Sequence, residues 1–237
     1  MDALIYSLVF SAISFVAFLA LKHFDRRLTY LFGILFAVYV GLGDLVTGLP
    51  PAVAELRFVN SRWNWSGQTY SLLFSLAVAA ALGLRLSTIG AVMPYRNVRV
   101  GSIAVTLLVA VSVVLGLVFR PSPPSAETIA FQALMPGVAE ELMFRGIAPV
   151  LLLGLIRGAR PPQSIPWVVV LIAAVPYGVV HGLGYSGGAF SFGALYALYT
   201  YTGGIIYGWL RFSTGSLLFP IAAHSLGNVA FELTGFL

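Results

Sequence analysis

The sequence contains no cysteine and very few charged residues. The absence of cysteine excludes disulfides, thiolate metal sites and a cysteine nucleophile. Charged residues make up only 9% of the chain, whereas a soluble globular domain has about 25%. Such a chain cannot cover a normal water-exposed surface, and its 59% of hydrophobic residues must face lipid over most of their area. The composition therefore predicts an integral membrane protein.

Eight hydrophobic runs approach or exceed the length of about 20 residues that a helix needs to cross a bilayer. We expect spans at 3–21, 28–49, 69–90, 101–119, 127–156, 165–183, 190–211 and 216–236. These runs predict an all-α fold, a polytopic transmembrane helix bundle of about eight spans that forms a single integral membrane domain over residues 1–237. The fifth run is long, so we expect it to be tilted, kinked near Pro136 or Pro149, or partly outside the lipid.

Basic residues lie mainly between the hydrophobic runs, where such charges set the orientation of the helices. One set of connections is the richer in cations and is predicted to be cytoplasmic, with Lys22, Arg26, Arg27, Arg96, Arg99, Arg157, Arg160 and Arg211. This places both termini outside. The net charge of +5 is explained by these flanking residues, and we expect no nucleic-acid partner. His23 reads as part of the same solvated flank. The cations follow the first run rather than precede it, so we expect a retained span and not a secretory signal.

Ionisable residues inside membrane helices are costly, and their positions indicate function. Glu140, Glu141 and Arg145 lie in the fifth run. Glu141 and Arg145 are four residues apart, with the acid first, and should form an ion pair on one helix face. Glu140 projects about 100° away from Glu141 and has no cation partner on its own helix. An unpaired buried carboxylate is a candidate general base, although both acids could instead belong to a charge network that only fixes packing.

Two histidines and an asparagine are the other candidate site residues in the later hydrophobic runs. His181 ends the sixth run, and His224 and Asn228 share one face of the eighth. Each could serve only as a hydrogen bond between helices. Together with Glu140 they suffice for hydrolysis by water: Glu140 would take and return a proton, one histidine would position the water or bind a metal, and the other histidine and Asn228 would stabilise an oxyanion. Ser186 has the one G-x-S-x-G setting, but it lies in a short connection between two hydrophobic runs and not at the strand-to-helix turn that such a nucleophile needs, and no H-E-x-x-H is present.

These residues resemble three motifs of one known family. Glu140, Glu141 and Arg145 match its EExxxR motif, Tyr177 and His181 resemble its FxxxH motif, and His224 and Asn228 match its HxxxN motif. The family is the CPBP group, which includes CAAX prenyl endopeptidases of the Ras-converting type and bacterial Abi or bacteriocin-processing homologues. The motifs occur in the family's order, within a motif-bearing half at about 127–237. The one departure is tyrosine in place of phenylalanine at position 177, whose extra hydroxyl needs a partner if buried.

The resemblance implies an eight-helix intramembrane endopeptidase. By analogy Glu140 and His181 activate the water, His224 and Asn228 form the oxyanion site, and Glu141, Arg145 and Tyr177 support them. The family has been described both as metalloproteases and as glutamate-dependent proteases. Glu140, His181 and His224 would suit a zinc ion with an open position, but we favour a glutamate general base without an essential metal. We expect a peptide or membrane-protein C-terminus as substrate, in a prokaryotic plasma membrane.

Two other functions are compatible with the same residues. The chain could be a non-proteolytic membrane scaffold or regulator, or a proton-coupled carrier that uses Glu and His as a relay. A carrier would more often show internal repeats, and none is found. A protease requires Glu140 and His181 within one water of each other, with Asn228 facing the same point. The position of Asp44 fits either the membrane interface or the lining of a wet cavity. Glu232 is expected to reach the headgroup region.

Overall fold

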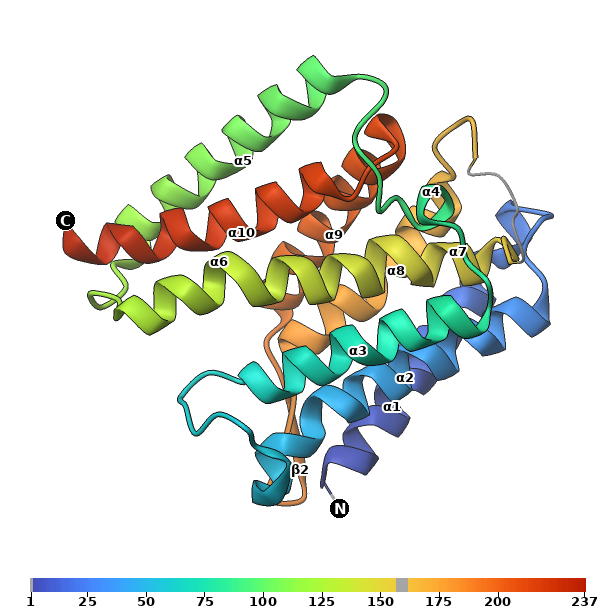
Figure 1. Ribbon diagram of the computed structural model, residues 1–237. Helices are drawn as coiled ribbons and strands as arrows, with labels where there is room; N and C mark the ends of the chain where they lie inside the picture. Colours follow the sequence, from blue (N-terminus) through green and yellow to red (C-terminus); the bar gives the residue numbers. More distant parts are fainter. Residues whose placement is uncertain (1, 157–161) are drawn as a thin grey trace.

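A computed structural model describes residues 2–156 and 162–237, which form a bundle of helices with one small β-hairpin (Figure 1). The longer helices are α1 (Asp2–Leu21), α2 (Tyr30–Ala52), α3 (Trp65–Ala81), α5 (Val98–Phe119), α6 (Ala126–Glu141), α8 (Trp167–Gly182), α9 (Ala194–Thr214) and α10 (Leu218–Leu233). Two short helices are α4 (Leu86–Ile89) and α7 (Ala148–Leu152). The hairpin consists of β1 (Leu183–Ser186) and β2 (Ala189–Phe192). Single 3-10 turns lie at Lys22–Phe24, Ala54–Leu56 and Thr234–Phe236.

Every predicted span contains one of these helices, so the prediction of a nearly all-α membrane bundle is confirmed. Within the described residues, three segments are long and apolar enough to cross a bilayer by themselves: Asp2–Phe24, Tyr30–Ala52 and Val98–Phe119. Trp167–Gly182 is apolar but shorter. The total of about eight spans stays a prediction.

The connections after α1 and after α3, which carry several of the predicted cytoplasmic cations, lie at the same end of the bundle (Figure 1). The side of the membrane on which they lie stays a prediction. Arg157 and Arg160, which belong to the same predicted set, lie outside the described residues.

Two predicted boundaries are wrong for local reasons. The third span was expected to continue to residue 90, but α3 ends at Ala81, and Gly83 then adopts a left-handed φ of +61°, as glycines at helix ends commonly do. The seventh span was expected to begin at residue 190, where the chain instead forms β2. Gly187 and Gly188 have φ values of +58° and +81°, which is the requirement of a type I′ hairpin turn.

Helix α6 occupies the centre of the bundle, between α3 on one side and α10 on the other (Figure 1). Helix α10 also packs along α5, and α8 packs against α9 and α1. Close approach between α8 and α9 depends on small residues, because a Cβ on Gly208 would lie 2.8 Å from Cγ1 of Val170 and one on Gly178 would lie 2.8 Å from Cβ of Tyr201. This packing brings the C-terminal ends of α6 and α8 and the middle of α10, which carry the motifs, to one cavity.

The long fifth run is interrupted by a π-helical segment at Leu142–Ile147, directly after Glu141. The amide of Ala148 donates to the carbonyl of Met143, five residues back. Pro149 has no N–H to continue the α-helical ladder, which accounts for a break near it, as expected. Pro136 lies within α6 without interrupting it. Single-turn π segments are frequent at functional sites.

Arg211, one of the cations predicted to lie on the cytoplasmic side, is buried near the end of α9. Its side chain is 1% exposed, and its guanidinium donates to the carbonyls of Thr88 at 2.8 Å and Ile89 at 3.3 Å. These carbonyls lie at the C-terminal end of α4, where a cation is favourable. Gly90 follows with a φ of +80°, and a Cβ there would lie 2.1 Å from Nε of Arg211. The burial of Arg211 therefore depends on this glycine.

Asp44 connects the first two helices. The hydroxyl of Ser7 on α1 donates to Oδ2 of Asp44 on α2 at 2.5 Å. The residue is partly buried, and this contact assigns it a packing role between α1 and α2.

We predict that Gly90→Ala destabilises the protein more than Gly83→Ala. Both positions have a positive φ, which costs a residue with a Cβ about 1–2 kcal/mol. A Cβ at Gly83 meets nothing within 4 Å, whereas one at Gly90 displaces Arg211. Thermal unfolding in detergent should show the lower midpoint for Gly90→Ala, and equal midpoints would contradict the role of Arg211.

Candidate active site

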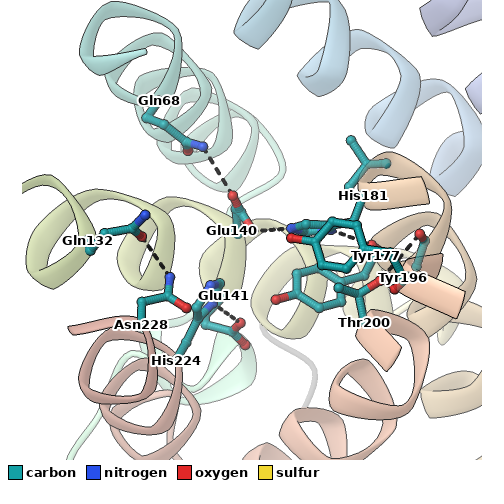
Figure 2. Close-up of polar contacts among 12 residues, drawn as sticks. Gln68, Gln132, Glu140, Glu141, Tyr177, His181, Tyr196, Thr200, His224 and Asn228 are labelled. Carbon is teal, nitrogen blue, oxygen red and sulfur yellow. Dashed lines mark hydrogen bonds and ion pairs between the residues drawn. The ribbon is translucent and has the colours of Figure 1, made fainter. Parts of the chain in front are cut away.

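A cavity of about 940 Å³ opens between α3, α5, α6, α8, α9 and α10. Its walls are mostly aromatic and aliphatic, with Trp63, Leu115, Phe119, Phe131, Leu195, Tyr196, Tyr199, Tyr207 and Phe231 among its lining residues. The polar side chains predicted from the motifs line the same cavity: Glu140, His181, His224 and Asn228. Figure 2 shows them converging from α6, α8 and α10. The chain thus gathers all four at one place.

Glu140 occupies the next-to-last position of α6 and presents two different oxygens. Oε1 accepts a hydrogen bond from Nε2 of Gln68 on α3 at 3.1 Å. Oε2 is buried without a hydrogen-bond partner among the described residues and lies 3.9 Å from Nε2 of His181. A buried carboxylate oxygen without a partner is costly and marks a position for a polar group brought by solvent or substrate.

His181 is oriented by its own helix. Its Nδ1 lies 2.8 Å from the carbonyl oxygen of Tyr177, one turn earlier. A carbonyl can only accept, so Nδ1 carries the proton and Nε2 of the neutral ring has a free lone pair. Nε2 is the atom that faces Glu140 (Figure 2).

Glu141 lies behind the cavity and is 0% exposed. Its Oε1 accepts from Nη1 of Arg145 at 3.0 Å and from Nδ1 of His224 at 2.9 Å. The expected ion pair therefore forms, and it extends to a third residue on another helix. The charge of Glu141 is thus balanced by two donors, whereas neither of these donors contacts Glu140.

An aromatic cage surrounds the Arg145 guanidinium. The ring of Tyr177 lies 3.8 Å from it and that of Tyr207 lies 5.3 Å away, both within the range of cation–π attraction. Tyr207 also stacks on the imidazole of His224, with centroids 5.6 Å apart. The aromatic ring at position 177 therefore contacts both the arginine and the imidazole of His181, whose centroid lies 4.7 Å from its own.

His224 and Asn228 share the face of α10 that lines the cavity, as expected from their spacing. Because Nδ1 of His224 donates to Glu141, its Nε2 is the free ring nitrogen. Asn228 uses one N–H of its amide to donate to Oε1 of Gln132 at 2.9 Å. The second N–H of that amide remains for another acceptor.

Two site residues were missed by the sequence reasoning. Gln132 lies eight residues before Glu140 on α6, and the four-residue spacing through Pro136 puts all three on one face of the helix. That spacing in the sequence could have indicated that Gln132 lies on the same face as Glu140. Gln68, near the start of α3, contacts Glu140 across 72 positions of sequence, and no local pattern indicates such a contact. Glu232, expected to reach the headgroups, instead contributes to the lining of the cavity.

The residues that would suit a zinc ion are not arranged as one donor set. Among the residues that the structure describes, no three His, Cys, Asp or Glu side chains group closely enough to hold a metal. Of the set Glu140, His181 and His224, only the first two approach each other, and His224 is bonded to Glu141. We therefore derive no chemical step through a metal ion.

We predict that Glu141→Ala and Arg145→Ala each destabilise the protein by about 3–5 kcal/mol, because each leaves a buried charge without its partner. Replacing both with leucine removes both charges and should cost less than either single change. Unfolding in detergent, followed by circular dichroism, measures the three variants. A double variant as unstable as the sum of the two single variants would contradict the pairing.

Comparison with known proteins bears on residues 122–230. This segment matches the family model described as type II CAAX prenyl endopeptidase Rce1-like. It contains all three motifs and every residue of the site except Gln68 and a part of the cavity wall. No curated protein and no solved structure matches the chain. The family match and the apolar helices together indicate an integral membrane peptidase, in agreement with the resemblance seen in the motifs. Residues 122–230, somewhat less than half of the chain, are thus similar to the Rce1-like type II CAAX prenyl endopeptidases.

Proposed function

We propose that the protein is an intramembrane endopeptidase that cleaves a peptide bond with a water molecule activated by Glu140 and His181. The observation that carries the proposal is the 3.9 Å separation of Oε2 of Glu140 from Nε2 of His181. Both atoms are hydrogen-bond acceptors when Glu140 is ionised and His181 is neutral. Two acceptors at that distance repel unless a donor with two protons lies between them, and water is such a donor.

A water held in this way directs its lone pairs away from both residues and toward the cavity. As it attacks the carbonyl carbon of a substrate, Glu140 takes one of its protons, and the peptide carbonyl becomes an oxyanion. Glu140 then returns the proton to the nitrogen of the leaving amine, the C–N bond breaks, and a carboxyl and an amine are formed. His181 keeps the water in place throughout.

The oxyanion would be stabilised from α10. The second amide N–H of Asn228 is a suitable donor, and Gln132 fixes the orientation of that amide. His224 can donate to the oxyanion through Nε2 when it is an imidazolium, and its ring is held in place by the contact of its Nδ1 with Glu141. Donors held in a water-poor cavity are more effective than the same donors in solution.

The geometry also bears on the alternative functions. The 3.9 Å between Glu140 and His181 leaves room for one bridging water, and Asn228 lines the same cavity, which supports the protease over the alternatives. A scaffold would have no need for an orphaned carboxylate oxygen in a cavity of this size. The walls are apolar, so we expect an extended peptide or the end of a membrane protein as substrate.

The function is tested by mapping protein termini in membranes from cells that make the wild-type protein or Glu140→Ala. Cleaved termini found only with the wild type would support the proposal and identify the substrate class. Identical sets of termini, with both proteins present at equal levels, would contradict it.

We predict that Glu140→Gln and His181→Ala lower the rate of cleavage by a factor of about 10²–10⁴, the usual contribution of a general base. Neither should change the unfolding midpoint in detergent by much, since neither residue belongs to the Glu141–Arg145 pair. Glu55→Gln, at an exposed position, is the matched control and should cleave normally. Near-normal turnover by Glu140→Gln would refute the assignment.

We predict that Asn228→Ala lowers kcat by a factor of about 10²–10³, and that Gln132→Leu has a smaller effect of the same kind. Gln132→Glu keeps an oxygen that accepts from Asn228 and should recover much of the lost rate. Steady-state kinetics on one cleaved peptide separates kcat from KM. A change confined to KM for Asn228→Ala would exclude its role in the transition state.

A further inference from the structure

The β-hairpin adjoins the proposed active site in sequence and in space. Strand β1 begins two residues after His181, and α9 begins two residues after β2. The first turn of α9 supplies Leu195 and Tyr196 to the cavity wall. Figure 1 shows the hairpin extending from the bundle beside the N-terminus. The hairpin is therefore continuous with the rim of the cavity.

The register of the hairpin determines which backbone groups face outward. The pairs are Leu183 with Phe192, Gly184 with Ser191, Tyr185 with Phe190 and Ser186 with Ala189. Beyond the pair of Leu183 and Phe192, the amide of Gly193 donates to the carbonyl of Gly182 at 2.8 Å. Hydrogen-bonded and non-bonded pairs alternate in an antiparallel ladder. The bonded pairs are thus those of Gly184 and Ser186, so the N–H and C=O groups of Phe190 and Phe192 point away from β1.

The two edges of the hairpin differ in their surroundings. On the β1 side, helix α1 packs against the strand, and the hydroxyl of Tyr6 donates to the carbonyl of Leu183 at 3.1 Å. On the β2 side all four residues are exposed. Among the residues that the structure describes, none forms a hydrogen bond with the outward backbone groups of Phe190 or Phe192. One edge is covered and the other is open.

An open strand edge is a template for an added strand, and unsatisfied backbone groups are especially costly near lipid. We propose that β2 binds the peptide substrate as a third strand, antiparallel to β2, through the backbone of Phe190 and Phe192. This inference rests on the proposed endopeptidase function. The occupant is an extended peptide, because its backbone presents the same alternation of donors and acceptors as this edge.

The direction of β2 specifies which part of the substrate it holds. The strand runs from the turn at Gly187 and Gly188 toward the cavity. An antiparallel partner therefore begins beside Phe192, at the cavity, and ends beside Ala189. The scissile bond then precedes the substrate segment that pairs with β2. Strand β2 therefore holds the substrate residues on the C-terminal side of the scissile bond. Phe190 and Phe192 also project their side chains to one face, where they offer apolar contact to alternate substrate residues.

The test uses purified protein in detergent and a library of peptides prepared from a digested proteome. Cleavage by wild type and not by Glu140→Gln first establishes the proposed function. If the wild-type protein cleaves no peptide, the proposed function is refuted, and the binding of substrate by β2 is refuted with it. The most rapidly cleaved peptide is then resynthesised as the probe for the hairpin.

Proline removes an outward N–H without breaking the ladder, as edge strands tolerate. We expect Phe190→Pro and Phe192→Pro to raise KM for that peptide at least tenfold with little change in kcat. Tyr185→Pro makes the same change on the covered edge and should leave KM unaltered. An unchanged KM in the two β2 variants, or an equal increase in Tyr185→Pro, would overturn the proposal.

A second readout does not depend on how well the variants fold. N-methylation of single amides on the C-terminal side of the scissile bond should slow cleavage at every second position, because an edge strand bonds alternate residues. Uniform effects, or none, would contradict pairing with β2. A shift from dimer to monomer in the proline variants, with unchanged KM, would instead assign the edge to a second copy of the chain and overturn the proposal.

Discussion

The site depends on how one buried carboxylate is neutralised. Glu141 has no exposed surface and would be very costly within a membrane protein without partners. Arg145 and His224 both donate to its Oε1. This contact joins the π segment after α6 to α10 and fixes the imidazole of His224. Tyr177 and Tyr207 enclose the arginine. Their positions on α8 and α9 are thereby tied to the same charge.

The neighbouring acid is free for chemistry because Arg145 and His224 donate to Glu141 and not to Glu140. Glu140 projects toward α3 and α8, where Gln68 holds one of its oxygens and His181 faces the other. His181 is itself oriented by a carbonyl of its own helix, and Asn228 by Gln132. Each side chain to which the proposal assigns a catalytic role is thus held by a second polar group. Adjacent acids on one helix acquire different roles from their surroundings alone.

Local sequence patterns predicted the helices and most of the site. Hydrophobic runs of sufficient length indicated where helices lie, and four-residue spacing indicated the Glu141–Arg145 pair. Contacts between distant segments were not predictable. Gln68 reaches Glu140 from another helix, and Arg211 is buried because α4, 120 residues earlier, offers its carbonyls. Residues 189–192 are as apolar as a membrane helix, and only the two glycines before them indicated a hairpin.

The central claim is that water, and not a side chain, attacks the substrate. A single turnover in water labelled with ¹⁸O, using a peptide that the protein cleaves, tests this most directly. Direct attack predicts one ¹⁸O atom in the new carboxyl group of every first-turnover product and none in the Glu140 side chain. Label in Glu140, or first-turnover product that contains only ¹⁶O, would show a covalent intermediate on the glutamate and contradict the account.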